Sequence, residues 1–96
     1  MPRREGDRLL LEGEVTVGSV AGILAATGRD DLAAAAIVDF RAVTEVDSAA
    51  VALAVAWLRE ARAAGRSIRF ENLPPALAKL ARLYAVAELL PGTGPG

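Results

Sequence analysis

The chain has 96 residues and a formal net charge of −1, and 53% of its residues are hydrophobic while only 4% are aromatic. This length suits one small domain with an aliphatic core, and the near-neutral charge excludes a general attraction to nucleic acid or anionic lipid. Cysteine and histidine are both absent, which excludes disulfides, thiolate metal sites and the commonest general base. An enzyme is therefore the weakest hypothesis, and we expect no cofactor, no metal and no nucleic-acid partner.

No window of the sequence reaches the length of about 20 apolar residues that spans a bilayer. The opening residues MPRREGDR also lack the apolar stretch of a secretion signal. Neither GxGxxG nor GxxxxGK[ST] occurs, so the chain encodes no phosphate-binding loop, and any nucleotide site has to come from a partner. We expect a soluble cytoplasmic protein without direct membrane insertion.

The first half of the chain is predicted to contain a loose segment, two short strands and a helix. Their expected bounds are residues 1–6 for the loose segment, 8–12 and 14–17 for the strands, and about 20–27 for the helix. Gly13 lies where the two strands would meet in a bend or hairpin, and Gly28 lies where the helix would end. Asp30 and Asp31 are expected to begin the loop that connects this helix to the next strand.

The second half repeats a strand–helix pattern. Its expected elements are a strand at 35–40, a turn region at 41–46, a helix at 48–64 that ends at Gly65, a strand at 67–71, a turn at 72–75 that starts a third helix, a final apolar turn near 86–90 and a tail at 92–96. The continuous apolar run in the strand at 35–40 suggests burial on both faces. The order β-β-α-β-α-β-α predicts an α/β fold, a small mixed sheet with helices packed against it in one domain over residues 7–91.

Asp47 and Ser48 stand at the predicted start of the helix at 48–64. A helix start leaves backbone N–H groups unpaired and favours negative charge, so a carboxylate and a hydroxyl there suit a helix cap. The same position suits a phosphate or a partner's contact. Asp39, after the apolar run, is expected to satisfy turn amides, and Glu45 to be a solvated turn charge.

The helix at 48–64 is apolar nearly all round in its first half. At about 100° per residue, Val51, Ala54, Val55, Leu58 and Ala61 fall on one face, which we expect to pack on the sheet. The opposite side carries Ala49, Leu53, Ala56, Trp57 and Glu60, so charged residues, which would be usual there, appear only in the second half of the helix. Either another helix of the domain covers Leu53 and Trp57, or they form a partner-binding patch centred on Trp57.

The remaining basic residues and Tyr84 are expected to have structural roles only. The basic residues Arg59, Arg62, Arg66 and Arg69 alternate with Glu60 and Glu71 and lack interleaved aromatics, so they predict a salt-bridged surface. Tyr84, on the third predicted helix, is expected in the core.

The segment Ile37–Leu58, IVDFRAVTEVDSAAVALAVAWL, resembles the strand, D-S-S-G-L-like motif and helix of the STAS domain family, which includes anti-sigma-factor antagonists. LEGEVTVGSV (11–20) is similar to the family's opening strand pair, and RSIRFENLPPALAKLARLYAVAELL (66–90) to its closing strand, helix and terminal turn. The LARLYAVAELLP ending and the single-hydroxyl Asp-Ser motif resemble the MlaB-like branch. Members of that branch are the STAS subunits of the Mla ABC complex, which moves phospholipids between bacterial membranes.

The resemblance implies a non-enzymatic accessory subunit that binds an MlaF-like ABC transporter ATPase, in a complex with a permease at the inner membrane. In MlaB-like proteins the region around Ser48 contacts the ATPase. The expected partner-binding residues are Asp47, Ser48, Ala49, Ala52, Leu53, Ala56 and Trp57.

An alternative is an anti-anti-sigma factor that binds a kinase-type anti-sigma factor under the control of serine phosphorylation. Ala49 falls where those antagonists place their phosphorylated Ser, so this alternative requires Ser48 as the phosphoacceptor. Ala50 stands where the family usually has Gly. The apolar face could also form a homodimer when the partner is absent. A third hypothesis, an enzyme acting through Asp39 and Asp47, is disfavoured by the missing His, Cys and phosphate loop.

Overall fold

The computed structural model describes residues 2–83; residue 1 and residues 84–96 lie outside the described part. In chain order the elements are β1 (Arg3–Glu5), β2 (Arg8–Val15), α1 (Val20–Ala26), α2 (Arg29–Ala34), β3 (Ile37–Val46), α3 (Ser48–Ala63), β4 (Arg69–Glu71) and α4 (Pro75–Leu83). The four strands form one sheet in the order β1-β2-β3-β4, with β1 antiparallel to β2 and the other pairs parallel. The predicted fold class, a small mixed sheet with helices against it, is confirmed.

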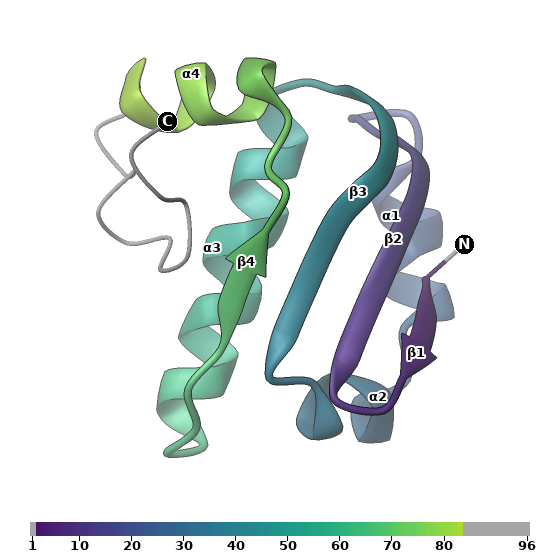
Figure 1. The fold of residues 1–96 in the computed structure, drawn as a ribbon, viewed down its shortest axis with the longest axis vertical. Coiled ribbons are helices and arrows are strands. Elements are labelled where there is room, and N and C mark those ends of the chain that lie inside the picture. The colour runs from purple at the N-terminus through teal and green to yellow at the C-terminus, as the bar shows by residue number, and fades with distance from the viewer. Residues whose placement is uncertain (1, 84–96) are drawn as a thin grey trace.

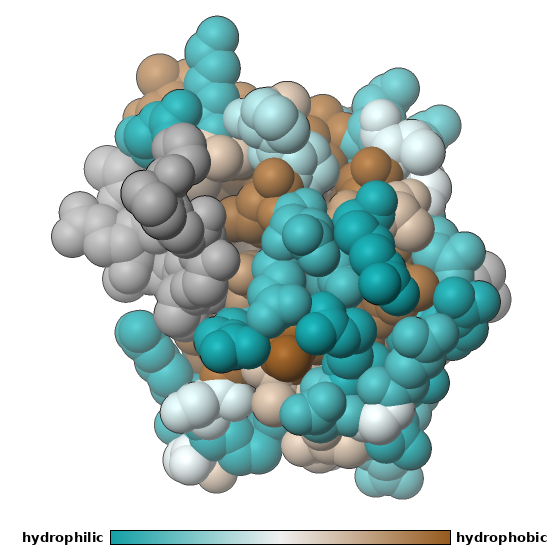
Figure 2. Space-filling view, viewed as in Figure 1, coloured by the Kyte–Doolittle hydropathy of each residue, from teal (hydrophilic) through white to brown (hydrophobic). Residues whose placement is uncertain are grey.

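The helices α1 and α3 lie on one face of the sheet, α2 lies at one end of it, and α4 crosses the opposite end beside α3 (Figure 1). Alternate side chains of the strands point toward α1 and α3 and form the core. Its largest fully buried apolar members are Phe40, Phe70, Leu9, Leu11, Leu77, Val15 and Val38. The other face is polar, and hydrophilic side chains gather over the strands there (Figure 2).

The N-terminal hairpin joins different segments from those predicted. Arg3–Glu5, expected to be loose, forms β1 and pairs with Arg8–Leu10, and the connecting turn uses Gly6 at φ 63°. Gly13, expected to make the hairpin, lies inside β2 at φ 75°, between two shifts in the register of β2 with β3. Glycine adopts this left-handed conformation without steric cost, so the strand distorts at Gly13 and continues.

The segment after α1 contains a helix that was not predicted. Gly28 ends the α1 region as expected but is also the N-cap residue of α2. The carbonyl oxygens of Leu32 and Ala33 at the end of α2 accept hydrogen bonds from the Arg66 guanidinium, at 3.2 and 3.1 Å. Because this short helix is held by a residue more than thirty positions away, its local sequence carried little signal.

The strand predicted at 35–40 is longer than expected. β3 runs through the predicted turn region to Val46, because residues 42–46 pair with the second half of β2. Val43 and Val46 pack against the core. The strand is buried on both faces at Val38, Asp39 and Phe40, as expected, although the cover over Asp39 is ionic and polar, and burial ends at the exposed Arg41.

The later elements agree with the prediction more closely. α3 spans Ser48–Ala63 and is followed by Gly65 at φ 72°, as the helix-stop pattern indicated. β4 lies inside the predicted strand, and α4 begins at Pro75. Tyr84, the final apolar turn and the tail lie outside the described residues. Within residues 2–83, none of the helices combines the length and the hydropathy that a membrane-spanning segment requires.

Candidate partner-docking site

Asp47 caps α3 and joins it to the loop after β2. Its Oδ1 accepts the N–H of Ala49 at 2.8 Å, and its Oδ2 accepts the N–H of Val17 at 3.0 Å. The predicted capping role is therefore confirmed, with a second bond that the local sequence did not reveal. Each carboxylate oxygen accepts one backbone N–H, so Asp47 holds the start of α3 against the loop after β2.

Ser48, the first residue of α3, is exposed. Ala49 beside it is half-buried and carries no hydroxyl. In the described part of the chain the Ser48 hydroxyl forms no side-chain hydrogen bond within the domain, unlike Ser19, which bonds Glu14 and Thr16. Ser48 is thus the accessible hydroxyl at the α3 start.

The predicted patch centred on Trp57 is wrong. Trp57 and Leu53 are each only 3% exposed, and both belong to the core cluster. The wheel placed them opposite the sheet-facing side, but α3 is flanked by α1 and α4 as well as covered by the sheet. The buried arc of α3 is therefore wider than one helical face, and the alternative reading, that the domain covers these two side chains, holds.

An apolar groove lies between α1 and α3, close to the capped end of α3. Its volume is about 290 Å³. The residues that line it, hereafter the α1–α3 groove, are Val20, Leu24, Ala49, Ala52, Leu53 and Ala56. Leu24 is 50% exposed, and Val17, in the loop before α1, is 79% exposed. The structure thus brings together four predicted partner-binding residues, Ala49, Ala52, Leu53 and Ala56.

The α1 side of the groove was missed by the sequence analysis. Leu24 was not among the expected partner-binding residues, yet half of its surface is open to water. A usable signal existed, because residues 17–28 contain no charged residue although α1 is a surface helix. The absence of charged residues was used as a signal of a binding surface for α3 but not for α1.

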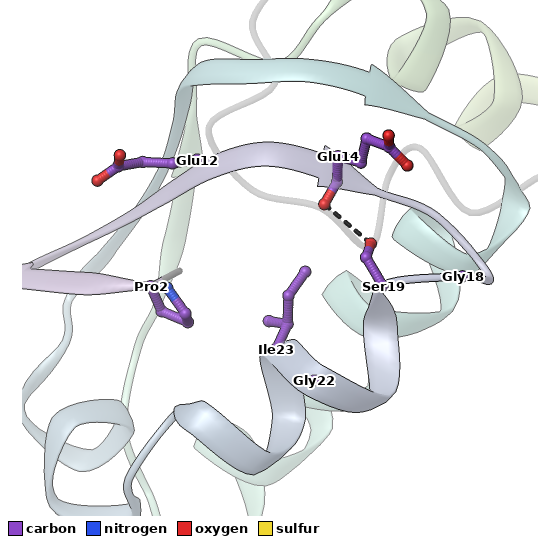
Figure 3. Close-up of a pocket in the computed structure, with 7 residues that line it drawn as sticks. All are labelled: Pro2, Glu12, Glu14, Gly18, Ser19, Gly22 and Ile23. Atoms are coloured by element: carbon purple, nitrogen blue, oxygen red, sulfur yellow. Dashed lines mark hydrogen bonds between the residues drawn. The ribbon is translucent and has the colours of Figure 1, made fainter.

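A second hollow, of about 480 Å³, lies on the other flank of α1, against β2. It is lined by Pro2, Glu12, Glu14, Gly18, Ser19, Gly22 and Ile23 (Figure 3). Ile23 points from α1 toward β2, and the Ser19 hydroxyl donates to the Glu14 carbonyl oxygen at 2.9 Å. This bond closes the α1 end of the hollow, and the geometry presents no nucleophile paired with a base.

A cluster of ionic side chains occupies the polar face of the sheet. Asp39 is fully buried and accepts hydrogen bonds from Arg8 at 2.7 Å and from Asn72 at 2.9 Å. It also accepts the backbone N–H of Arg41 at 2.9 Å, so the predicted amide bond forms, although within a strand and not a turn. Arg8 bridges to Glu71 at 2.8 Å. We refer to Arg8, Asp39, Asn72 and Glu71 as the ionic cluster.

These contacts hold the carboxylates in the charged form. Burial by itself raises the pKa of Asp39, but hydrogen bonds from Asn72, the Arg41 N–H and Arg8 outweigh it, and the pKa lies below its ordinary value. The hydrogen bond from Arg8 likewise lowers the pKa of Glu71, against a smaller opposing effect of burial. The same bonds raise the pKa of Arg8. A carboxylate stabilised in this way is a poor general base.

Asp39 and Asp47 do not form a catalytic pair. Asp47 follows Asp39 by eight residues along an extended segment, which separates them by about 25 Å. In the described part of the chain, no group of three acidic side chains comes together in a way that could hold a metal ion.

Comparisons with known proteins agree with this fold. The family model described as "Mlab, STAS domain" matches residues 3–91. The solved structure of the anti-sigma factor antagonist SpoIIAA in its unphosphorylated form is similar, with a TM-score of 0.62 and 21% identity over 86% of this chain and 81% of that chain. The phosphorylated form of the Bacillus cell fate determinant SpoIIAA gives a TM-score of 0.64 and 18% identity over 99% and 91%. A search among curated proteins found no significant match.

Proposed function

We propose, because this chain belongs to the MlaB STAS domain family, that it is a non-enzymatic accessory subunit of a phospholipid-transport ABC complex. It would bind the MlaF-like ATPase of that complex and be held at the cytoplasmic side of the inner membrane through this partner. No bond is made or broken on this chain in such a role. Its effect requires only a higher affinity for one conformation of the ATPase than for another.

The observation that carries this proposal is the α1–α3 groove. Its lining is apolar, it opens beside the exposed Ser48, and Leu24 and Val17 leave large apolar areas in water at the same end. Each Å² of apolar surface removed from water by docking contributes about 25 cal/mol, so a partner that covers these side chains gains directly. Trp57 supports this surface from within the core, and the half-buried Asp47 holds the start of α3 beside it.

Ala52→Glu tests the docking surface. Ala52 is exposed in the groove, so a glutamate there adds a charge to the interface while leaving the core intact. We expect Ala52→Glu to weaken co-purification with the ATPase by about 100-fold or more, because a buried unpaired charge costs several kcal/mol. Ala76→Glu, an equal change on the exposed side of α4, is the control and should bind normally. Equal binding by both variants would contradict the proposal.

The second candidate is an anti-anti-sigma factor controlled by phosphorylation of Ser48. It is favoured by the exposure of Ser48 at a helix start and by the shared fold with SpoIIAA. Mass spectrometry after incubation with the cognate anti-sigma kinase tests it, with Ser48→Ala as the control. Phosphate on Ser48 that abolishes kinase binding would support this candidate, and an unmodified chain would exclude it.

A further inference from the structure

The loop between β2 and α1 exposes an apolar residue and buries a polar one. Val17 is 79% exposed, whereas Thr16 beside it is only 7% exposed. The two side chains have nearly the same shape, and the hydrophobic effect favours the opposite arrangement, with the valine inside and the hydroxyl in water. The burial of side chains therefore does not explain the conformation of this loop, and other interactions have to fix it.

Ser19 supplies one of these interactions. It stands at the N-cap position of α1, where a serine hydroxyl ordinarily accepts an N–H of the helix, but within residues 2–83 it makes no such bond. Its Oγ turns back to the loop, where it accepts the Thr16 N–H at 2.9 Å and donates to the Glu14 carbonyl oxygen at 2.9 Å. A single hydroxyl therefore joins the start of α1 to the end of β2.

Asp47 holds the same loop from the side of α3. Its Oδ2 accepts the Val17 N–H at 3.0 Å, while its Oδ1 caps Ala49, a residue that lines the α1–α3 groove. The N–H groups of Thr16 and Val17 are thus bonded to two side chains from different elements. The loop is fixed from both sides, and its valine side chain is left in water beside the capped end of the groove.

We propose that Ser19 is a positioning residue for partner binding, because it holds Val17 in place beside the α1–α3 groove. This inference rests on the proposed function and adds a residue that acts from outside the contact surface. Ser19 lines the hollow on the β2 flank of α1, so its effect on binding is transmitted through the loop. A side chain that is already held in place loses less conformational freedom when a partner covers it, and the affinity is higher for that reason.

A purely local role for the Ser19 hydroxyl fits the geometry less well. Thr27, at the other end of α1, shows such a role, since its Oγ1 donates to the Ile23 carbonyl oxygen of the same helix at 2.7 Å. The bonds of Ser19 instead restrain a short loop whose valine faces water. A local exception to the hydrophobic pattern that several side-chain bonds maintain is typical of a functional site.

A double-mutant cycle tests whether Ser19 acts through Val17. The affinity for the MlaF-like ATPase is measured by calorimetry at a temperature where every variant is folded. Ser19→Ala and Val17→Ala should each weaken binding about fivefold. The double variant should bind no more weakly than Val17→Ala alone, because the loop then has no valine side chain to position. Ser19→Thr keeps the hydroxyl and should bind within about twofold of the wild type.

Thr27→Ala is the matched control. It also removes a hydroxyl bonded to a backbone carbonyl in the α1 region, but away from the loop, and should leave binding unchanged. Amide hydrogen exchange supplies a readout that does not depend on the partner. Ser19→Ala should speed exchange at Thr16 and Val17, while the amides of β3 keep their protection.

Four results would overturn the inference while the proposed function stands, provided that the wild-type chain binds the ATPase. Ser19→Ala could bind as tightly as the wild type, or the two losses could multiply in the double variant. Ser19→Ala could weaken binding without faster exchange in the loop, or Thr27→Ala could weaken binding equally. If the wild-type chain does not bind the ATPase, the proposed function and the inference fail together.

Discussion

The ionic cluster and the α1–α3 groove show opposite relations between a surface and its own fold. In the ionic cluster, the buried carboxylate of Asp39 receives hydrogen bonds from three residues of the same chain, and Arg8 is shared with Glu71. In the groove, Leu24 and the neighbouring Val17 expose apolar surface that nothing in the described part of the chain covers. The ionic cluster is complete by itself, whereas the groove leaves apolar surface that the proposed partner would cover.

Under the proposed function, this difference in exposure and hydrogen bonding assigns a structural role to the ionic cluster and a binding role to the groove, and residue type alone would suggest the reverse. Buried charges often mark active sites, but here every buried side-chain nitrogen or oxygen in the described residues has a hydrogen-bond partner. Alanines and a leucine are usually assigned to structure, but here they form the open surface. A satisfied polar group needs nothing further, while exposed apolar area gains free energy when it is covered.

The largest expected effect comes from Asp39→Ala. Removal of this carboxylate leaves Asn72, the Arg41 N–H and part of the Arg8 guanidinium without an acceptor, and we expect a loss of about 3 kcal/mol in the free energy of unfolding. Urea denaturation measures it, and Ala52→Glu should change stability by less than about 0.5 kcal/mol. If the Asp39→Ala domain kept its stability but lost ATPase binding, the assignment of the ionic cluster to stability and of the groove to binding would be contradicted.

Acidification should weaken the same region. The pKa values of Asp39 and Glu71 are lowered on folding, so their stabilising contribution is complete above the unfolded values of about 4 and is lost as the pH falls through the folded values. Thermal unfolding at a series of pH values between about 6 and 2 measures the slope. Asp39→Asn should flatten this slope, and an unchanged slope would show that other carboxylates control acid stability.

Asp47→Ala should affect both stability and binding, because Asp47 caps α3 and holds the loop that carries Val17. We expect a loss of about 1–2 kcal/mol in the free energy of unfolding. ATPase binding should also weaken, measured by calorimetry at a temperature where the variant is fully folded. Asp47→Asn, which retains one side-chain acceptor, should fall between the wild type and Asp47→Ala in both measurements.

The smallest expected effect is a gain. Gly22 lies in α1 on the flank away from the groove, and a Cβ added there would meet nothing within 4 Å. Gly22→Ala should therefore stabilise the domain by about 0.5–1 kcal/mol, since alanine is the better helix former, and leave ATPase binding unchanged. Weaker binding by Gly22→Ala would place the partner on the β2 side of α1 and would sharpen the boundary of the docking site.

Elements with strong local signals were predicted well. The start of α3 at Asp47 and Ser48, its end before Gly65 and the start of α4 at Pro75 follow from capping, left-handed glycine and proline at a helix start. The uncharged α3 wall of the α1–α3 groove could also be predicted, since the absence of charge around Ala52 and Ala56 is a property of the sequence itself.

Features that depend on distant residues were missed. α2 is held by Arg66, and the second half of β3 depends on pairing with β2. The burial of Trp57 belongs to the same group. A helical wheel gives the direction of each side chain from the axis, but it does not say how many neighbours surround the helix. β1 is a different case, because it pairs with residues only three to seven positions away, and the prediction placed that hairpin at Gly13 instead of Gly6.

The sequence by itself determined the α/β class, the capped start of α3 and the uncharged character of its first half, because these depend on residues within a few positions of one another. Only the tertiary structure decided which apolar side chains remain in water. The sheet, α1 and α4 surround α3 and bury Leu53 and Trp57, so the open surface falls on Leu24, Ala52 and Ala56. Exposure depends on which elements pack together, and that depends on the whole chain.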